Sequence, residues 1–110
     1  MNDEQVVKIV GEHFNVHEYE EGQIELETWT TGGVNMFITL DPDERKTFLE
    51  QFKEYVEDFD VDEQVDLHRE GDDYRKVFSV RQSLEDFEAY EKFLEKMVAQ
   101  LEEAAVCPLV

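Results

Sequence analysis

The sequence has one cysteine, two prolines and no long uncharged apolar run. Cys107 cannot form an internal disulfide alone, and no other zinc ligands cluster with it, so we expect a free thiol. The apolar runs are too short to cross a bilayer, and residues 1–13 lack the basic start and apolar stretch of a secretory signal. These absences predict a cytoplasmic protein that does not enter a membrane.

Basic residues are also scarce. Ten Lys and Arg stand against 29 Asp and Glu, which gives a formal net charge of -19. A chain with this charge repels the phosphates of nucleic acids and the headgroups of anionic lipids, so we expect it to bind neither directly. The excess is greatest in residues 54–73, which contain ten acids and one base. Partners are therefore expected to be cationic or neutral.

The hydrophobic pattern predicts a single α+β domain that covers residues 1–110. The composition is 41% hydrophobic and includes eight Phe, which is enough for one core. Apolar residues at near-helical spacing behind Asn2 or Asp3 predict a short N-terminal helix.

From Gln23 the apolar period changes to two, which predicts a β-hairpin. Gly32 and Gly33 supply the positive φ that its tight turn requires. Residues 14–20 are a candidate third strand, so we expect an antiparallel sheet of two to four strands. One face of the hairpin supplies the inward-facing set Ile24, Leu26, Thr28, Val34, Met36, Ile38 and Leu40.

A middle helix is predicted over residues 42–58, with Asp41 as its cap and Glu44 closing a capping box. An acidic connector follows, in which four apolar residues are expected to anchor the segment to the core while its carboxylates face water. The helix stripe consists of Phe48, Leu49, Phe52, Val56 and Phe59, and the connector anchors are Phe59, Val61, Val65 and Leu67.

The C-terminal part is predicted to contain a short strand, with Val77, Phe78 and Val80 as its apolar residues, and a long amphipathic helix that packs on the sheet. Ser83 and Asp86 have the spacing of a capping box for this helix, which should run to about residue 104. Its apolar stripe is Leu84, Phe87, Tyr90, Leu94, Met97, Val98 and Leu101.

The acidic residues at positions 58–62 have a spacing found in some metal-binding loops. Asp58, Asp60 and Asp62 match the Asp-x-Asp-x-Asp start of a calcium-binding EF-hand loop. That loop needs Gly at its sixth position and Glu at its twelfth, where this chain has Glu63 and Arg69. Both critical positions fail, so no metal or other cofactor is predicted.

The three histidines give only weak signals of a catalytic or metal site. His13 and His17 are four residues apart, but the spacing crosses an expected helix end and defines no third ligand. His68 lies near acids that would raise its pKa, without an identifiable Ser or Cys nucleophile. A small metal-dependent or hydrolytic enzyme centred on His68, with Asp62, Asp66 or Tyr74, is therefore an alternative to the main hypothesis.

Trp29 lies on the opposite strand face from the inward set, together with Phe37. An exposed aromatic pair there would be a partner-binding anchor, whereas a covering helix would bury it. Both arrangements are open from the sequence.

Four segments taken together, "ETWTTGGVNMFITL", "YVEDFDVDEQVDLHRE", "YRKVFSV" and "SLEDFEAY", carry a resemblance across residues 24–95. They resemble small acidic uncharacterised proteins of conjugative elements, plasmids and phages of Gram-positive gut bacteria. That group shares a Trp-x-x-Gly-Gly-Val segment, an acidic segment ending near Leu-His-Arg, and a Tyr-Arg pair. The resemblance implies a setting in mobile-element biology and carries no catalytic residue.

The leading hypothesis is a non-enzymatic interaction protein that binds a basic surface of a protein partner. Its strongest form is a DNA mimic, which must present carboxylates at a density comparable to one charge per about 1.7 Å of duplex axis. A structural or oligomerisation module using the stripe of the last helix is a further alternative. The residues predicted to contact the partner are Asp58, Asp60, Asp62, Glu63, Asp66, Glu70 and Trp29.

Overall fold

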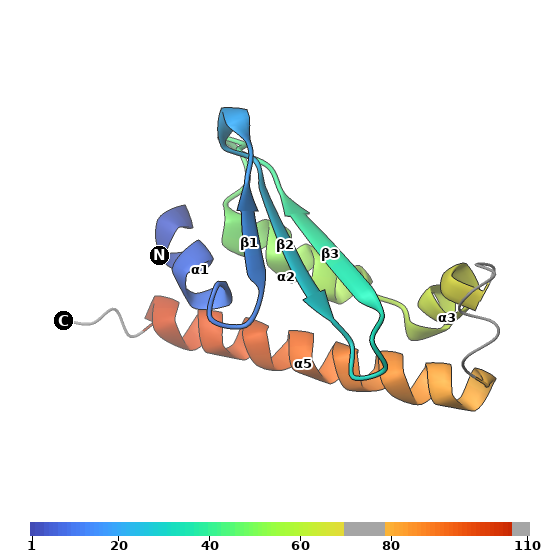
Figure 1. Cartoon of the computed structure of the whole chain (residues 1–110). Helices are drawn as coiled ribbons and strands as arrows, with labels where there is room; N and C mark the ends of the chain where they lie inside the picture. The colour runs from blue at the N-terminus through green and yellow to red at the C-terminus, as the bar shows by residue number, and fades with distance from the viewer. Residues whose placement is uncertain (70–78, 107–110) are drawn as a thin grey trace.

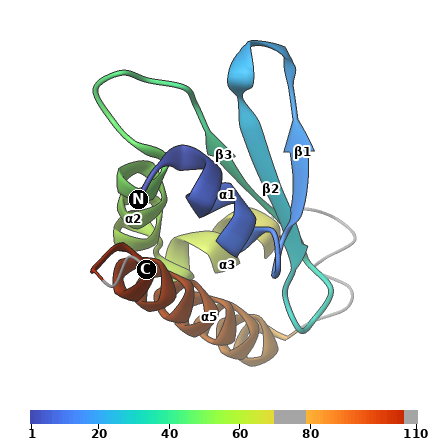
Figure 2. The same ribbon diagram turned by 90° about the vertical axis from the view of Figure 1, so that its left-hand side faces the viewer.

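The computed structural model describes residues 1–69 and 79–106, and it confirms the α+β class. A three-stranded antiparallel sheet lies against helices on one of its faces (Figures 1 and 2). The described elements are α1 (Asp3–Val10), β1 (Asn15–Glu18), a 3-10 turn (Glu20–Gly22), β2 (Ile24–Trp29), β3 (Asn35–Leu40), α2 (Phe48–Asp58), α3 (Val61–Arg69) and α5 (Val80–Val106).

The predicted N-terminal helix is confirmed, and Asn2 is its cap. The Asn2 side chain accepts from the Gln5 N–H at 2.9 Å, and the Gln5 side chain accepts from the Asn2 N–H at 2.8 Å. This reciprocal box satisfies two backbone donors that a helix start leaves unpaired. Val6 and Val10 of α1 are buried in the core.

The strands follow the order β1-β2-β3, which confirms the candidate third strand. Leu26 pairs with Ile38 at the centre of the hairpin, and both side chains face the helices. At the turn only Gly33 has a positive φ, of 90°, so the prediction that Gly32 shares this role is wrong. Gly32 instead donates its N–H to the Asp86 carboxylate at 2.8 Å.

The predicted start of the middle helix is wrong, whereas its end at Asp58 is confirmed. Helix α2 begins at Phe48, and the Thr47 hydroxyl caps it by accepting from the Glu50 N–H at 3.1 Å. The preceding segment folds into a turn because the Asp43 side chain accepts from the Arg45 N–H at 2.8 Å. This local bond competes with helix formation, as Asp side chains often do.

The acidic connector was predicted without regular structure, but it forms helix α3. Asp60 accepts from the Glu63 N–H at 3.2 Å, which starts the helix. Carboxylates in its first turn also complement the helix dipole. Phe59 and Val65 are buried as anchors, whereas Leu67 is 56% exposed and does not serve as one.

Helix α5 starts earlier than the predicted capping box. Ser79 and Gln82 form the box that starts it, and Ser83 is buried inside the helix, where its hydroxyl donates to the Ser79 carbonyl at 3.1 Å. Val80 is helical, so the predicted strand is wrong at that position. The rest of that strand, with Val77 and Phe78, lies outside the described residues.

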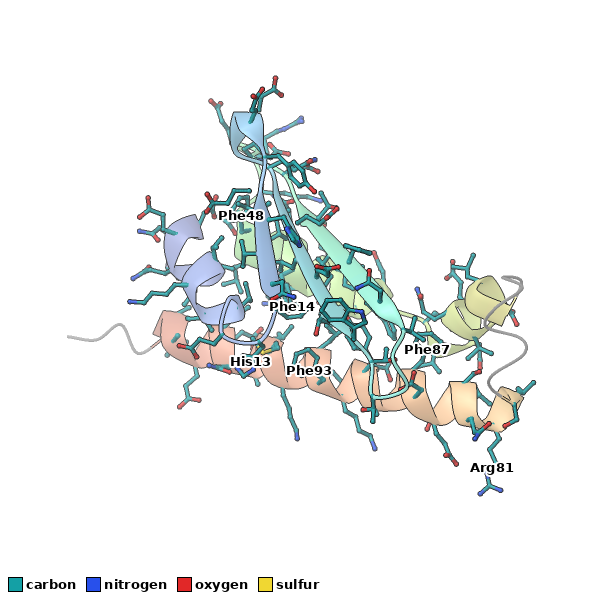
Figure 3. The ribbon with its side chains drawn as sticks, viewed as in Figure 1. His13, Phe14, Phe48, Arg81, Phe87 and Phe93 are labelled. Atoms are coloured by element: carbon teal, nitrogen blue, oxygen red, sulfur yellow. The ribbon has the colours of Figure 1, made fainter. Side chains whose placement is uncertain are left out.

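The stripe of α5 forms the centre of the core. Phe87, Leu94 and Leu101 are fully buried within the domain, so these side chains are not available for self-association. Phe14, from the loop before β1, contacts Phe93 of α5 and Phe52 of α2 at ring distances of 5.5 and 6.3 Å (Figure 3). Burial of each large apolar side chain contributes about 1.5–3 kcal/mol, so this cluster ties the sheet edge to both helices.

Candidate functional site

The junction of α2 and α3 lies beside the N-terminal half of α5 (Figure 1). A groove of about 600 Å³ lies between these segments. Carboxylates from two separate segments of the chain surround it, accompanied by one basic residue. The charged lining consists of Glu57, Asp58, Asp60, Asp62, Glu88, Glu91 and Lys92. We call these residues the acidic groove.

Phe59 positions the first rim of the acidic groove. It ends α2 with an extended backbone, and its buried ring contacts Tyr90 of α5 at a centroid distance of 5.6 Å. Because this ring is fixed in the core, Asp58 and Asp60 on either side of it are held at the surface, where both are exposed. The apolar anchor therefore fixes the position of the acidic residues that flank it.

The second rim comes from α5. Glu88 and Glu91 are three residues apart and are therefore neighbours on the helix surface. Glu88 is exposed, whereas Glu91 lies half-buried at the border of the core, one turn from both Phe87 and Leu94. Sequence reasoning missed these two carboxylates as site residues. The helical phase of α5 indicates which residues face outward, but it does not show that α3 lies beside them.

The Asp-x-Asp-x-Asp run does not wrap around a central point. Asp58 ends α2, and Asp62 lies in the first turn of α3, so the run crosses from one helix into the next. Within residues 1–69 and 79–106, no three His, Cys, Asp or Glu side chains lie close enough together to hold a metal ion. The groove therefore presents its carboxylates outward as a charged surface.

The other predicted partner-binding residues are distributed over different surfaces. Glu63 and Asp66 are exposed on α3, next to the acidic groove but outside its lining. Glu70 and Tyr74 lie outside the described residues, as does the side chain of His68. The structure joins Asp58, Asp60 and Asp62 into one site with Glu88 and Glu91.

Trp29 lies apart from the acidic groove. It is 51% exposed and borders a smaller cavity of about 250 Å³ with Ala89 and Phe93. Those two residues occupy a different face of α5 from Glu88 and Glu91. Phe37 is 45% exposed on the neighbouring strand, so the aromatic pair is not covered by a helix.

A hydrogen-bonded cluster occupies the outer face of the sheet. Glu27 accepts from Asn35 at 3.1 Å and pairs with the His17 ring at 2.9 Å. These hydrogen bonds, from His17 first and then Asn35, hold the pKa of Glu27 below its ordinary value. His13 instead packs its ring edge against Phe93 at 6.1 Å, so the two histidines do not form a ligand pair.

The hairpin turn is attached to α5 by a buried carboxylate. Asp86 accepts from the Thr30 hydroxyl and the Gly32 N–H, and the same hydroxyl oxygen accepts from the Val34 N–H at 3.0 Å. Sequence reasoning assigned Asp86 to a capping box, which is wrong. Only the three-dimensional approach of the turn to α5 identifies its role.

Comparisons with protein-family models, curated proteins and solved structures find no match to this chain. Among its described helices, none is both long and apolar enough to cross a membrane.

Proposed function

We propose that this protein is a non-enzymatic interaction protein that binds a basic surface of a protein partner through the acidic groove. One observation carries the proposal: two rims from distant parts of the chain place six carboxylates and one Lys around a single concavity. A groove with charge on both sides suits a protruding Lys- or Arg-rich helix or loop better than it suits a flat surface.

The charge of the whole chain supports the same proposal. A net charge of -19 attracts a cationic partner from a distance and raises the rate of encounter. At physiological ionic strength the Debye length is about 8 Å, so the carboxylates lining the groove dominate once the partner approaches. Binding should therefore be fast and strongly dependent on salt.

A DNA mimic is the more specific form of this proposal. Duplex DNA presents two phosphate strands beside a groove, and the acidic groove presents two rims of carboxylates. The partner would then be a nucleic-acid-binding protein, and occupation of its cleft would inhibit it. The resemblance to acidic proteins of mobile elements makes a bacterial cytoplasm the proposed setting.

The test uses a fluorescein-labelled Arg-rich peptide and the full chain, with binding followed by anisotropy as sodium chloride rises from 50 to 200 mM. We expect the affinity to fall by at least about tenfold, because several close charge pairs are screened. An affinity that does not change with salt contradicts the proposal. For the mimic, the full chain must also displace duplex DNA from a captured basic partner.

A further inference from the structure

Among the strands that the structure describes, β3 is at an edge of the sheet and carries none of the usual protection against pairing. Its sequence, Asn35–Leu40, contains no charged residue and no proline, although 35% of the chain is charged. Its register with β2 runs from Ile24 and Leu40 to Trp29 and Asn35 without a bulge. Natural proteins usually place Lys, Pro or a bulge on such an edge to prevent strand addition.

The hydrogen-bond pattern shows which backbone groups point away from the sheet. Thr30 donates to the Val34 carbonyl at 2.9 Å, which places this residue pair on the bonded side of the ladder. By alternation, the backbones of Asn35, Phe37 and Thr39 direct their N–H and C=O groups to the free edge. No described residue outside the sheet forms a hydrogen bond with these three backbones.

The helix flank nearest this edge carries two carboxylates, one of them paired with a Lys. Gln51 of α2 donates to the Asp41 carbonyl at 2.7 Å, directly after β3, whereas Lys53 faces α5 and pairs with Glu102. Glu54 and Asp58 lie three and seven residues beyond Gln51 and so occupy the same flank of α2. A strand added to β3 would therefore lie close to Asp58 and to Glu54, which already pairs with Lys46 at 2.8 Å.

We propose that the outer edge of β3 receives an extended, Lys- or Arg-containing segment of a partner protein as a fourth strand. Backbone hydrogen bonds to Asn35, Phe37 and Thr39 provide the pairing, and Asp58 together with the net charge of -19 favours cationic side chains. A second copy of this chain does not fit, because pairing of two β3 edges brings together two chains that each carry a net charge of -19. The inference rests on the proposed function only for the positive charge of the partner.

The probe is a capped peptide of about nine residues in which Lys alternates with Val and Thr. Its matched control carries the same side chains but is N-methylated at alternate backbone positions, so that it keeps the charge and loses the pairing donors. We expect the unmodified peptide to bind the full chain at least about tenfold more tightly, with NMR shifts of the amide signals of Asn35, Phe37 and Thr39. Equal affinities for the two peptides overturn the inference.

A protein variant provides a second test. Thr39→Pro removes one outward N–H, which an edge strand tolerates, whereas Thr39→Val keeps it. We expect both variants to fold and only Thr39→Pro to lose about tenfold in affinity for the unmodified peptide. If both variants bind alike, the edge is not the site. Binding of the Arg-rich peptide at the acidic groove should survive in both variants, so failure of one proposal is distinguishable from failure of the other.

Discussion

The carboxylate of Asp86 accepts a hydrogen bond of 2.5 Å from the hydroxyl of Thr30, across 56 residues of sequence. A second bond, from the Gly32 N–H, reaches the other oxygen of the same carboxylate at 2.8 Å. Both Asp86 and Thr30 are buried, so neither bond competes freely with water. This attachment fixes the hairpin turn against α5, the helix that also supplies one rim of the acidic groove.

Asp86→Ala should destabilise the fold, because it leaves the Thr30 hydroxyl and the Gly32 N–H without their acceptor. Hydrogen bonds to a charged group each contribute about 1.5–3 kcal/mol, so the loss of two should lower the free energy of unfolding by about 3–6 kcal/mol. The melting temperature should drop by roughly 15–30 °C for a domain of this size. Circular dichroism during heating measures the change.

Glu85→Ala is the matched control, since it removes a neighbouring carboxylate whose only ion pair in the described chain is an exposed one with Arg81. Its effect should stay within about 0.5 kcal/mol. Equal melting temperatures for the two variants would show that the hydrogen bonds of Asp86 to the turn do not stabilise the fold.

Tyr90 should be replaceable by Phe with a gain in stability. Its hydroxyl oxygen is buried and forms no hydrogen bond with any described residue. Burial raises the pKa of this phenol well above its ordinary range, which reflects the cost of removing it from water. An unpaired buried hydroxyl costs about 1–3 kcal/mol, so Tyr90→Phe should raise the melting temperature, and a decrease would contradict this description of the core.

The Glu27 cluster should contribute stability that depends on pH. The pKa of Glu27 lies below its ordinary value of 4.5 in the folded chain, so its contribution is present above that pH and disappears as pH falls through the lower folded value. Thermal melts from pH 7 to pH 3 should show wild type and Glu27→Gln converging at the acid end. Glu12→Gln, at an exposed position, is the reference with the same change of charge. If Glu27→Gln lowers the melting temperature by the same amount at every pH, the pH-dependent stability does not come from Glu27.

The sequence predicts the apolar pattern of this fold well because burial imposes periods of two and about 3.6 residues. The inward strand set, the stripe of α5 and the end of α2 at Asp58 follow from it. Helix starts were less predictable, since several polar residues compete for the cap. Thr47 and Ser79 serve as caps in place of Asp41 and Ser83. Helix α3 was missed because its apolar anchors, although identified, are few among many charged residues and did not by themselves indicate a helix.

The acidic groove was only half predictable for a related reason. Asp58, Asp60 and Asp62 stand out as a cluster in the linear sequence, whereas Glu88 and Glu91 join them only because α3 packs beside α5. Trp29 was assigned to the same partner-binding set from strand alternation, although it lies on another surface. The local sequence therefore identifies the acidic residues but does not show that they surround a groove.

The central claim is that the position of the carboxylates, beyond their number, creates the binding site. Its most direct test compares two variants that each carry four fewer negative charges than wild type. One changes the groove residues Asp60, Asp62, Glu88 and Glu91 to their amides. The other makes the same change at the exposed positions Glu4, Glu12, Glu44 and Glu103, which lie outside the groove lining.

Both variants are titrated with the Arg-rich peptide at 100 mM salt, and their melting temperatures verify that they fold. We predict that the groove variant loses at least about tenfold in affinity, while the variant with distant changes loses much less, because screening limits charges beyond about 10 Å. Equal losses in the two variants would contradict the account and reduce the acidic groove to one part of a generally acidic surface.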